Sequence, residues 1–487
     1  MSEAVVDSGT SNARNAQVLR PPGPPPRKTL LAHARYYGGF ALDPIAFVKS
    51  RFEDYGDMYY VPTGEGGLFV MRHPDHLREV LTTRASSFSK EHSAFEQLSR
   101  VLGEGLLTSD GDTWTRQRRM VQPAFAPARM AGYARVMVEE SQRTADAWRD
   151  GGTRDVGNEM MSLTLRIVSR ALFGHEVPDR DIAVIGDAMT SFQDSLSTPD
   201  LLPAWVPVPG RRRLARSLAG LDAIIHRLIE ERMALVAEGA SAARADLLEL
   251  LVTAVDVEGR GGKLTVTEVR DQLVTLFLAG HETTSHALTW TWACLASNPR
   301  CERALHAELD AVLGGRAPEL ADLERLPYTE QVISEAMRLY PPVWGIARRA
   351  REDTEVGGYP VPRGAEVMLW VYLTQRDARF FPNPEAFEPE RFAKDRIGSM
   401  PKNTYLPFGA GPRACIGRAF AMTEARLILA TLAQRHRLAL RRGQSLAAKP
   451  RITLTPKRAI KMVITPRDAR ERSRSDRSSS PDPAPRP

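Results

Sequence analysis

The sequence predicts a mainly α-helical protein with small β-sheets attached. Most segments between the two ends of the chain repeat apolar residues at helical spacing. Short extended runs, at residues 58–61 and 68–71, interrupt that pattern. The longest helical segment starts at the capping box Thr265-x-x-Glu268 and ends before Asn298. At 1.5 Å per residue its roughly 30 residues span about 45 Å, so this helix would cross the whole domain.

Composition and length fit one large folded domain between two tails. Hydrophobic residues make up 43% of the 487-residue chain and charged residues 26%, so the chain can bury a large core. The expected units are a disordered tail with a proline-rich lead-in at 1–26, a folded domain at 27–466, and a disordered tail at 467–487. The last segment is rich in Ser, Pro and Arg and lacks the apolar residues that ordering requires.

Charge and cysteine content narrow the class of protein. A formal net charge of +7 fits either an acidic redox partner or an ordinary solvated surface. No nucleic-acid-binding motif is visible, which argues against a nucleic-acid partner. Three cysteines are too few for a disulfide framework, and the sequence shows neither a signal peptide nor 18 consecutive apolar residues. We therefore expect a cytoplasmic monomer without a membrane anchor.

The middle of the longest helical segment breaks its own pattern. Residues 273–279 are apolar on nearly every face, which indicates burial. Gly280 and the polar run 281–285 follow directly. Such violations of local preference often mark functional sites. A polar helix face that meets another helix or a water is the structural alternative.

A glycine-rich run at 408–417 leads into the helical run 419–432 and contains Cys415. A cysteine at this place lies just before a helix N-terminus, where the helix dipole and free N–H groups favour a thiolate. The glycines at 409, 411 and 417 would allow a tight turn and close approach of a flat ligand. A lone cysteine is more often a small buried hydrophobe, and we interpret Cys294 and Cys301 in that way.

The spacing around Cys415 decides between these alternatives. Five residues match the pattern Phe-x-x-Gly-x-Arg-x-Cys-x-Gly: Phe408, Gly411, Arg413, Cys415 and Gly417. A chance match in a chain of this length is on the order of one in ten thousand. The run resembles the cysteine-ligand signature of the cytochrome P450 superfamily. The resemblance implies that fold, with a long central helix over a haem b cofactor and Cys415 as the iron ligand.

Further motifs extend the resemblance over roughly residues 30 to 465. Glu335-x-x-Arg338 followed by Pro389-Glu-Arg391-Phe implies a buried Glu335–Arg338–Arg391 network with a structural role. Without the resemblance, a Glu and an Arg three apart on a helix are usually a solvated pair. Gln375-Arg-Asp-Ala departs from the His-Arg-Asp-Pro run common in the family, away from the expected chemistry.

The haem-binding residues follow from the same resemblance. Trp114-x-x-x-Arg118 resembles the family's helix that holds a haem propionate, a task suited to the planar guanidinium group. Arg348 and Arg413 match further propionate partners by position, and Phe408 and Gly417 belong to the haem loop. For His92 a surface position is favoured over a haem contact.

The polar break resembles the family's oxygen-activation motif in its microsomal-like bacterial form. Residues 279–284 read Ala-Gly-His-Glu-Thr-Thr. Cleavage of dioxygen needs protons, so Thr283 is expected to fix a water beside the oxygen and Glu282 to relay protons from solvent. Gly280 is expected to open a groove in the helix.

The sequence as a whole therefore predicts a haem-thiolate monooxygenase that inserts one atom of O2 into an apolar substrate. Analogy with the branch favours fatty acids or terpenoids. Without flavin or iron–sulfur motifs in the chain, a ferredoxin and its reductase are the expected electron donors. Pocket residues are expected among Leu276, Ala279, Gly280, Val343, Trp344 and Ile346.

Two other classes of function remain open from sequence. A peroxide-driven hydroxylase or a haem-thiolate isomerase of the same fold often lacks the acid–alcohol pair Glu282-Thr283. A non-enzymatic haem sensor would not need that pair at all.

Overall fold

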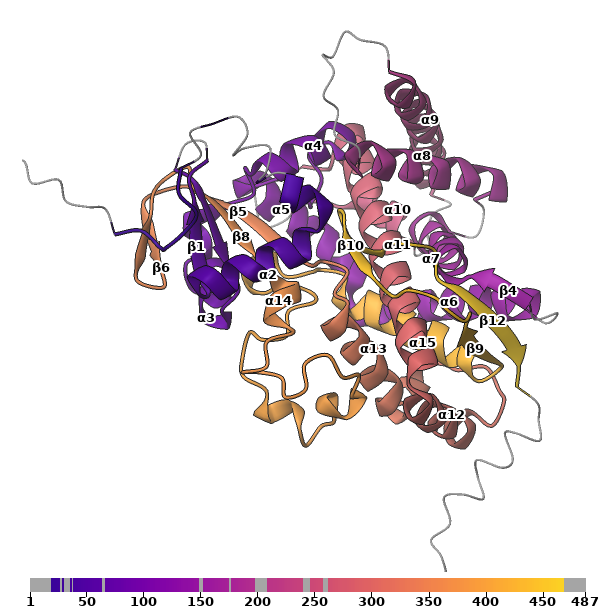
Figure 1. The fold of residues 1–487 in the computed structure, drawn as a ribbon. Helices are drawn as coiled ribbons and strands as arrows, with labels where there is room; N and C mark the ends of the chain where they lie inside the picture. The colour runs from indigo at the N-terminus through magenta and orange to yellow at the C-terminus, as the bar shows by residue number, and fades with distance from the viewer. Residues whose placement is uncertain are drawn as a thin grey trace, which may run out of the picture.

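A computed structural model describes residues 19–26, 29, 36, 38–63, 66–148, 152–174, 177–197, 208–239, 246–256 and 262–467. Residues 1–18 and 468–487, which hold most of the expected tails, lie outside these ranges. Figure 1 shows a sheet-rich part on the left, which includes β1, β5 and β8, and a helical part on the right. No helix among the described residues has the length and apolar character needed to cross a membrane.

The helical prediction is confirmed, and the longest described helix is the expected one. The helices of the described ranges are α2 (Pro44–Tyr55), α3 (Pro74–Arg78), α4 (Ser93–Leu102), α5 (Gly111–Val121), α6 (Pro127–Ala147), α7 (Val156–Phe173), α8 (Asp179–Ser197), α9 (Pro209–Ala237), α10 (Leu247–Thr253), α11 (Val266–Ser297), α12 (Pro299–Leu313), α13 (Pro327–Leu339), α14 (Val371–Thr374) and α15 (Arg418–Ala433).

The strands form small sheets, as expected. The five-stranded sheet has the order β1-β2-β8-β5-β3 and contains both predicted runs, β1 (Met58–Val61) and β2 (Leu68–Met71). The remaining strands of this sheet are β3 (Phe88–Ser89), β5 (Ile346–Ala350) and β8 (Glu366–Leu369). The smaller sheets are β4 (Gly152–Asp155) with β12 (Lys461–Pro466) and β9 (His436–Leu440), β6 (Thr354–Val356) with β7 (Tyr359–Val361), and β10 (Ala448–Pro450) with β11 (Leu454–Pro456).

The proline-rich lead-in packs on the edge of the five-stranded sheet. The backbone N–H of Tyr60 donates to the carbonyl of Pro22 at 3.0 Å, and the guanidinium of Arg20 lies 5.1 Å from the Tyr60 ring centroid. A Cβ at Gly23 would meet the Tyr60 carbonyl oxygen at 1.9 Å, so the close approach requires glycine. The lead-in is therefore part of the fold from residue 20.

Helix α11 spans two separate hydrophobic cores. Its N-terminal cap is the predicted capping box, in which the Glu268 N–H donates to Thr265 Oγ1 and the Thr265 N–H to Glu268 Oε2. Residues 269–278 contribute to one core with α8, α9 and α10, and residues 287–295 to another with α6, α7, α13 and α15. The polar run 281–285 lies between the two cores, which fix both ends of the helix.

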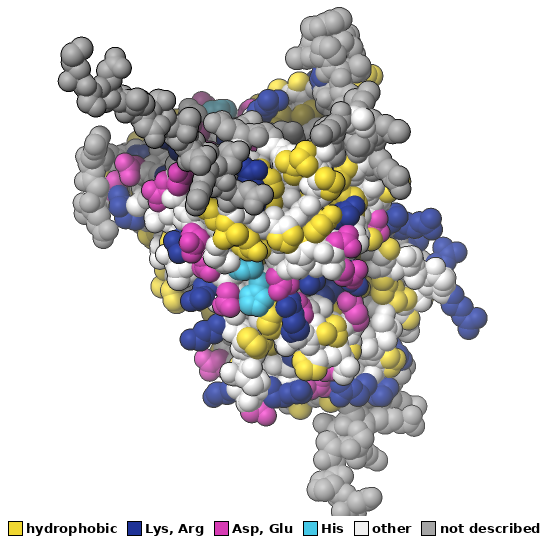
Figure 2. Space-filling view, turned by 60° about the vertical axis from the view of Figure 1, so that its left-hand side comes forward, with side chains coloured by type: hydrophobic (Ala, Val, Ile, Leu, Met, Phe, Trp, Pro, Cys, Tyr) yellow, Lys and Arg dark blue, Asp and Glu magenta, His cyan; other side chains and the backbone are white. Residues whose placement is uncertain are grey.

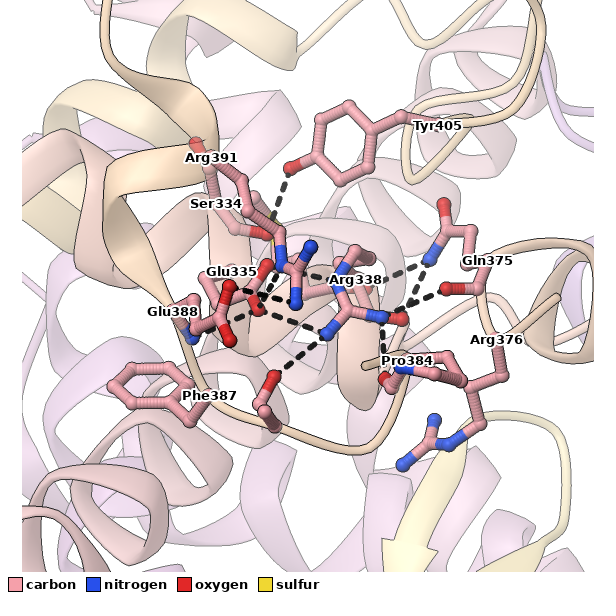
Figure 3. Close-up of polar contacts among 12 residues, drawn as sticks. Ser334, Glu335, Arg338, Gln375, Arg376, Pro384, Phe387, Glu388, Arg391 and Tyr405 are labelled. Carbon is pink, nitrogen blue, oxygen red and sulfur yellow. Dashed lines mark hydrogen bonds and ion pairs between the residues drawn. The ribbon is translucent and has the colours of Figure 1, made fainter. Parts of the chain in front are cut away.

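A buried charge network fastens α13 to the irregular segment that precedes the glycine-rich loop (Figure 3). Arg338 Nε donates to Glu335 Oε2 at 2.7 Å, and its Nη2 donates to Glu335 Oε1 at 2.8 Å. Arg391 Nε reaches Glu335 Oε1 at 3.3 Å. Glu335 and Arg338 have no exposed surface, so the expected buried network is confirmed.

Backbone carbonyls complete the network from several segments. Arg338 donates to the carbonyls of Gln375, Pro384 and Ala386 at 2.8–3.0 Å. The Gln375 side chain also donates to the Arg338 carbonyl and accepts from the Leu406 N–H. The Gln375 run therefore belongs to this network, and the glutamine supplies a donor and an acceptor there.

Charges on the surface are mixed in sign. On the face drawn in Figure 2, basic and acidic side chains are interspersed rather than gathered by sign. On this face the charges are mixed, as on an ordinary solvated surface.

Replacing Glu335 by Ala should lower the free energy of unfolding by about 3–5 kcal/mol, because two arginines would keep buried charges without a partner. Chemical denaturation of Glu335→Ala and wild type measures this. The matched control is Arg300→Ala, which removes the exposed Arg300–Glu390 pair at 3.0 Å and should cost less than about 1 kcal/mol. Equal losses in the two variants would contradict the structural role of the network.

Candidate active site

The glycine-rich loop before α15 is a tight turn held by its own backbone. The Cys415 N–H donates to the Phe408 carbonyl at 2.9 Å. Gly409 and Gly411 have positive φ angles of 67° and 68°, as expected for tight turns. A Cβ at Gly411 would lie 1.8 Å from the carbonyl oxygen of Leu81, so only glycine fits. Gly417 has a φ of −87°, which any residue can adopt.

Cys415 differs from the two other cysteines in its surroundings. Cys294 and Cys301 are buried, as interpreted from the sequence, whereas Cys415 is exposed. Although Cys415 has an exposed surface, the loop removes water from part of the sulfur's surroundings and so raises the pKa of the thiol, while the Gly417 N–H and the charges of Arg118 and Arg418 act to lower it. Coordination to a metal would deprotonate the thiol.

One face of α11 is accessible between the two cores. Ala279 is exposed and Gly280 and Thr283 are partly exposed, whereas residues 271–278 are buried. Positions 279, 280 and 283 lie on one side of a helix. Thr283 Oγ1 donates to the Ala279 carbonyl at 2.6 Å. A Cβ at Gly280 would lie 3.2 Å from Val168, so this glycine also allows α7 to pack closely against α11.

Glu282 does not share the accessible face with Thr283. Its side chain is buried, and Thr453, between β10 and β11, donates a hydrogen bond to Glu282 Oε1 at 2.7 Å. Burial raises the pKa of Glu282, and the bond from Thr453 partly opposes this. Glu282 and Thr283 are thus adjacent in sequence, but their side chains point in different directions, and that of Glu282 points away from solvent.

A cluster of basic side chains lies where α5, β5 and the loop meet. Arg118 Nη1 donates to the Ala414 carbonyl at 3.1 Å, which ties α5 to the loop. The Arg413 guanidinium lies 3.8 Å from the Trp114 ring centroid and forms an ion pair with Asp110. Arg348 is buried on β5, and burial together with the charge of Arg413 lowers the pKa of Arg348 to about 10. The structure therefore gathers Trp114, Arg118, Arg348 and Arg413, as expected.

Lys90 is a further member of this cluster, and the sequence analysis missed it. Burial lowers its pKa well below the usual value, and the charges of Arg348 and Arg413 add to this effect. Lys90 Nζ donates to the Leu107 carbonyl at 2.8 Å. Its place next to the turn before α4 carries no motif, so only the fold brings it to the arginines.

The prediction of a surface position for His92 is wrong. Only 8% of His92 is exposed, and its Nε2 lies 3.6 Å from a carboxylate oxygen of Glu366 on β8. The strand β8 pairs with β5 at Arg348, so His92 lies near the sheet that carries part of the cluster.

The expected pocket residues separate into two groups. Leu276 belongs to a hydrophobic cluster against which Trp114 and Ile416 pack. This cluster joins α11, α5 and the loop. Ile346 lies beside the loop: a Cβ added to Gly409 would be 3.9 Å from its side chain. Trp344 instead packs against Trp370, 5.0 Å between ring centroids, and donates to the Arg451 carbonyl, so it is an anchor of the sheet-rich part.

These features fit haem. An exposed thiol on a rigid loop can bind iron, and an accessible Ala–Gly–Thr face on a buried helix suits a flat apolar ring. Asp110 forms an ion pair with Arg413 of the basic cluster and also one with Arg351, at 2.7 Å. One carboxylate therefore faces several arginines, and the cluster has an excess of positive charge. Two propionates would balance that charge.

The chain is similar to known proteins over most of its length. A family model described as Cytochrome P450 matches residues 21–463. Cyclooctatin synthase of Streptomyces melanosporofaciens is 39% identical over 432 residues, which are 88% of this chain and 92% of that protein. Cyclooctat-9-en-7-ol 5-monooxygenase of the same organism is 35% identical over 81% and 85% of the two chains.

Two further comparisons concern a third relative and a solved structure. Pentalenene oxygenase of Streptomyces avermitilis is 31% identical over 87% of this chain and 93% of that protein. The crystal structure of the cytochrome P450DA heme domain superposes with a TM-score of 0.81 at 27% identity, over 93% of this chain and 99% of that one.

If Cys415 is the iron ligand, the reduced carbon monoxide adduct should show the strongly red-shifted band of thiolate ligation. Cys415→His should lose that band and the activity. Cys294→Ala and Cys301→Ala are matched controls and should keep both, because these thiols are buried away from the loop. An unchanged absorption spectrum in Cys415→His would rule out this ligand.

Proposed function

Because the chain belongs to the cytochrome P450 family, we propose that it inserts one oxygen atom of O2 into a terpenoid-like apolar substrate, with electrons supplied by separate redox proteins. It is a cytochrome P450 monooxygenase, and its cofactor is haem b. The observation that carries the proposal is the accessible face of α11, where Thr283 interrupts an otherwise buried apolar helix.

The haem would be held from two sides of the site. Cys415 would bind the iron, with Phe408 and Gly417 in the same loop against the ring. The propionates would be bound by Trp114, Arg118, Arg348 and Arg413, together with Lys90. When bound, a thiolate-ligated haem supplies the activation of dioxygen, because the thiolate donates electron density that favours O–O cleavage.

Thr283 and Glu282 would have different roles in proton delivery. The Thr283 hydroxyl donates to Ala279 in the structure and can accept a hydrogen bond from a water on the accessible face. The raised pKa of Glu282 allows its carboxyl group to hold a proton closer to neutral pH than an ordinary glutamate does. To pass that proton towards Thr283, Glu282 would exchange its bond to Thr453 for a bond to water.

The substrate class follows from the apolar surroundings and from the relatives. Leu276 and Ala279 on α11 and Ile346 beside the loop offer no charged group to a substrate. Pentalenene is a terpenoid hydrocarbon, and the other two relatives carry cyclooctatane names. These names favour a terpenoid over the fatty acid that the branch analogy also allowed.

The electron donors would be a ferredoxin and its reductase. The sequence given contains no flavin or iron–sulfur motif. The net charge of +7 suits an acidic electron carrier.

Thr283→Ala should keep haem binding and the thiolate spectrum but uncouple electron use from product. Product per electron pair should fall by up to about a hundredfold, the lower end of what a positioned proton donor contributes, and peroxide should rise. The measurement is a balance of reduced nicotinamide used, peroxide released and product formed. Thr291→Ala is the control, because Thr291 is buried and donates to Ala287 two turns further along α11.

Full coupling in Thr283→Ala would remove its hydroxyl from the relay. A different result would favour the peroxide-driven alternative. In that case wild type would form product from peroxide as readily as from the ferredoxin system.

A panel of cyclic terpenoids and fatty acids should separate the two substrate classes. Terpenoids are expected to shift the main haem absorption band at lower concentration than fatty acids of similar size, because the expected pocket residues Leu276, Ala279 and Ile346 offer only apolar contacts. Tighter binding of the fatty acids would contradict the terpenoid proposal.

A further inference from the structure

Glu424 is a buried acid that the proposed reaction does not use. It lies on α15, two turns after the start of that helix, and none of its surface is exposed. Neither carboxyl oxygen has a hydrogen-bond partner among the described residues. Buried polar groups nearly always have a partner, so this carboxyl group calls for a specific explanation.

The surroundings of Glu424 favour its neutral form. Burial raises the pKa of Glu424 to about 8, and the nearby Thr284 hydroxyl is the one side chain that opposes the shift. Among the described residues, no cation would balance an ionised carboxylate at this position. At neutral pH the group is therefore a carboxylic acid, which can donate as well as accept a hydrogen bond.

The elements packed against α15 supply no charge to Glu424, because their ionisable groups have other partners or are neutral. On these elements Glu140 binds Arg166, Glu282 binds Thr453, Glu335 binds Arg338, Asp322 binds Arg316, Glu308 binds Thr329, and burial keeps His436 neutral by lowering its pKa to about 4. On α15 itself, Arg426 binds Glu330 at 2.9 Å. His286 on α11 is also neutral, because burial lowers its pKa to about 4.

Thr284 is a matching exception in the middle of α11. Hydroxyl groups near it donate back to carbonyls of their own helix: Thr283 to Ala279, Ser285 to Glu282, Thr289 to Ser285 and Thr291 to Ala287. The Thr284 hydroxyl is buried and makes no such bond to Gly280 or to any described residue. Two polar groups without other partners thus face each other across the contact between α11 and α15.

We propose that Glu424, as a neutral acid, binds the Thr284 hydroxyl by a hydrogen bond and thereby positions the α11 turn that carries Glu282 and Thr283. This inference rests on the proposed function. A threonine that bonds the carbonyl four residues back tends to bend its helix. By holding the Thr284 hydroxyl, Glu424 keeps it away from the carbonyl of Gly280, where Val168 of α7 lies close to α11. Glu424 is therefore a positioning residue that acts through Thr284.

Infrared spectroscopy of the resting, haem-loaded protein tests the neutral acid directly. Wild type in heavy water at neutral pH should show the carbonyl stretch of a protonated carboxylic acid that is absent in Glu424→Gln. Thr284→Val should shift this band, because the carboxyl group loses its partner, but should not remove it. An identical carboxylic-acid region in wild type and Glu424→Gln would overturn the proposal.

The pH dependence of unfolding gives a second test. A carboxyl group whose pKa rises from 4.5 to about 8 on folding is protonated in the native state and ionised in the unfolded state between these values. The native state then binds more protons than the unfolded state, so stability falls as pH rises through this range. Glu424→Gln, neutral at every pH, should show a smaller fall. An equal fall in the two proteins would contradict a neutral Glu424.

Coupling separates positioning from a merely structural role. Glu424→Leu and Thr284→Val should lower product per electron pair by roughly tenfold in the haem-loaded fraction, as loss of an outer partner does. Glu424→Gln should restore most of it, because the amide can still bond Thr284. Normal coupling in both Glu424→Leu and Thr284→Val would overturn the positioning role, even if stability fell.

Failure of the proposed function would look different. In that case wild type would form no product with any electron source, while the infrared band and the pH dependence of unfolding would still report on Glu424. Should Glu424→Leu not fold, Thr284→Val and the infrared comparison with Glu424→Gln decide the question.

Discussion

The fixed position of α11 is the constraint on which the rest of the site depends. Two hydrophobic cores bury the two halves of this 32-residue helix, so neither half can turn or slide independently. Side chains of both cores are close-packed and resist small displacements. The short stretch between them, at residues 279–283, therefore presents a fixed accessible face, on which Thr283 has a defined place. A polar hydroxyl can be positioned there because the fold supplies rigidity on either side.

The opposite wall of the site is held by different means. The glycine-rich loop is fixed by its own backbone bonds and by the contact of Gly411 with the Leu81 carbonyl. Behind it, the Glu335–Arg338–Arg391 network joins α13 to the segments around Gln375 and Pro384. Charged hydrogen bonds thus stabilise the side of the site that carries the loop, and apolar packing stabilises the side formed by α11.

The features that local sequence patterns predicted are those that depend on residues close together in the chain. The capping box of α11, the strands at 58–61 and 68–71, the loop around Cys415 and the buried pair Glu335–Arg338 are all visible in spacing or motif. What the sequence did not predict depends on contacts between distant segments. Lys90 joins the arginines only because strand β3 pairs with β5, and Glu282 gains a bond from Thr453 only because the segment between β10 and β11 lies against α11. Glu424 and Thr284 meet only where α15 crosses α11.

We infer that haem lies between the Cys415 loop and the accessible face of α11. An anomalous-scattering map of the iron in crystals of the haem-loaded protein tests this placement. We expect one iron peak at bonding distance from the Cys415 sulfur, on the side that faces Ala279 and Thr283, with the propionates against Lys90, Arg118, Arg348 and Arg413. An iron peak bound to any other side chain, or a ring turned away from α11, would contradict it.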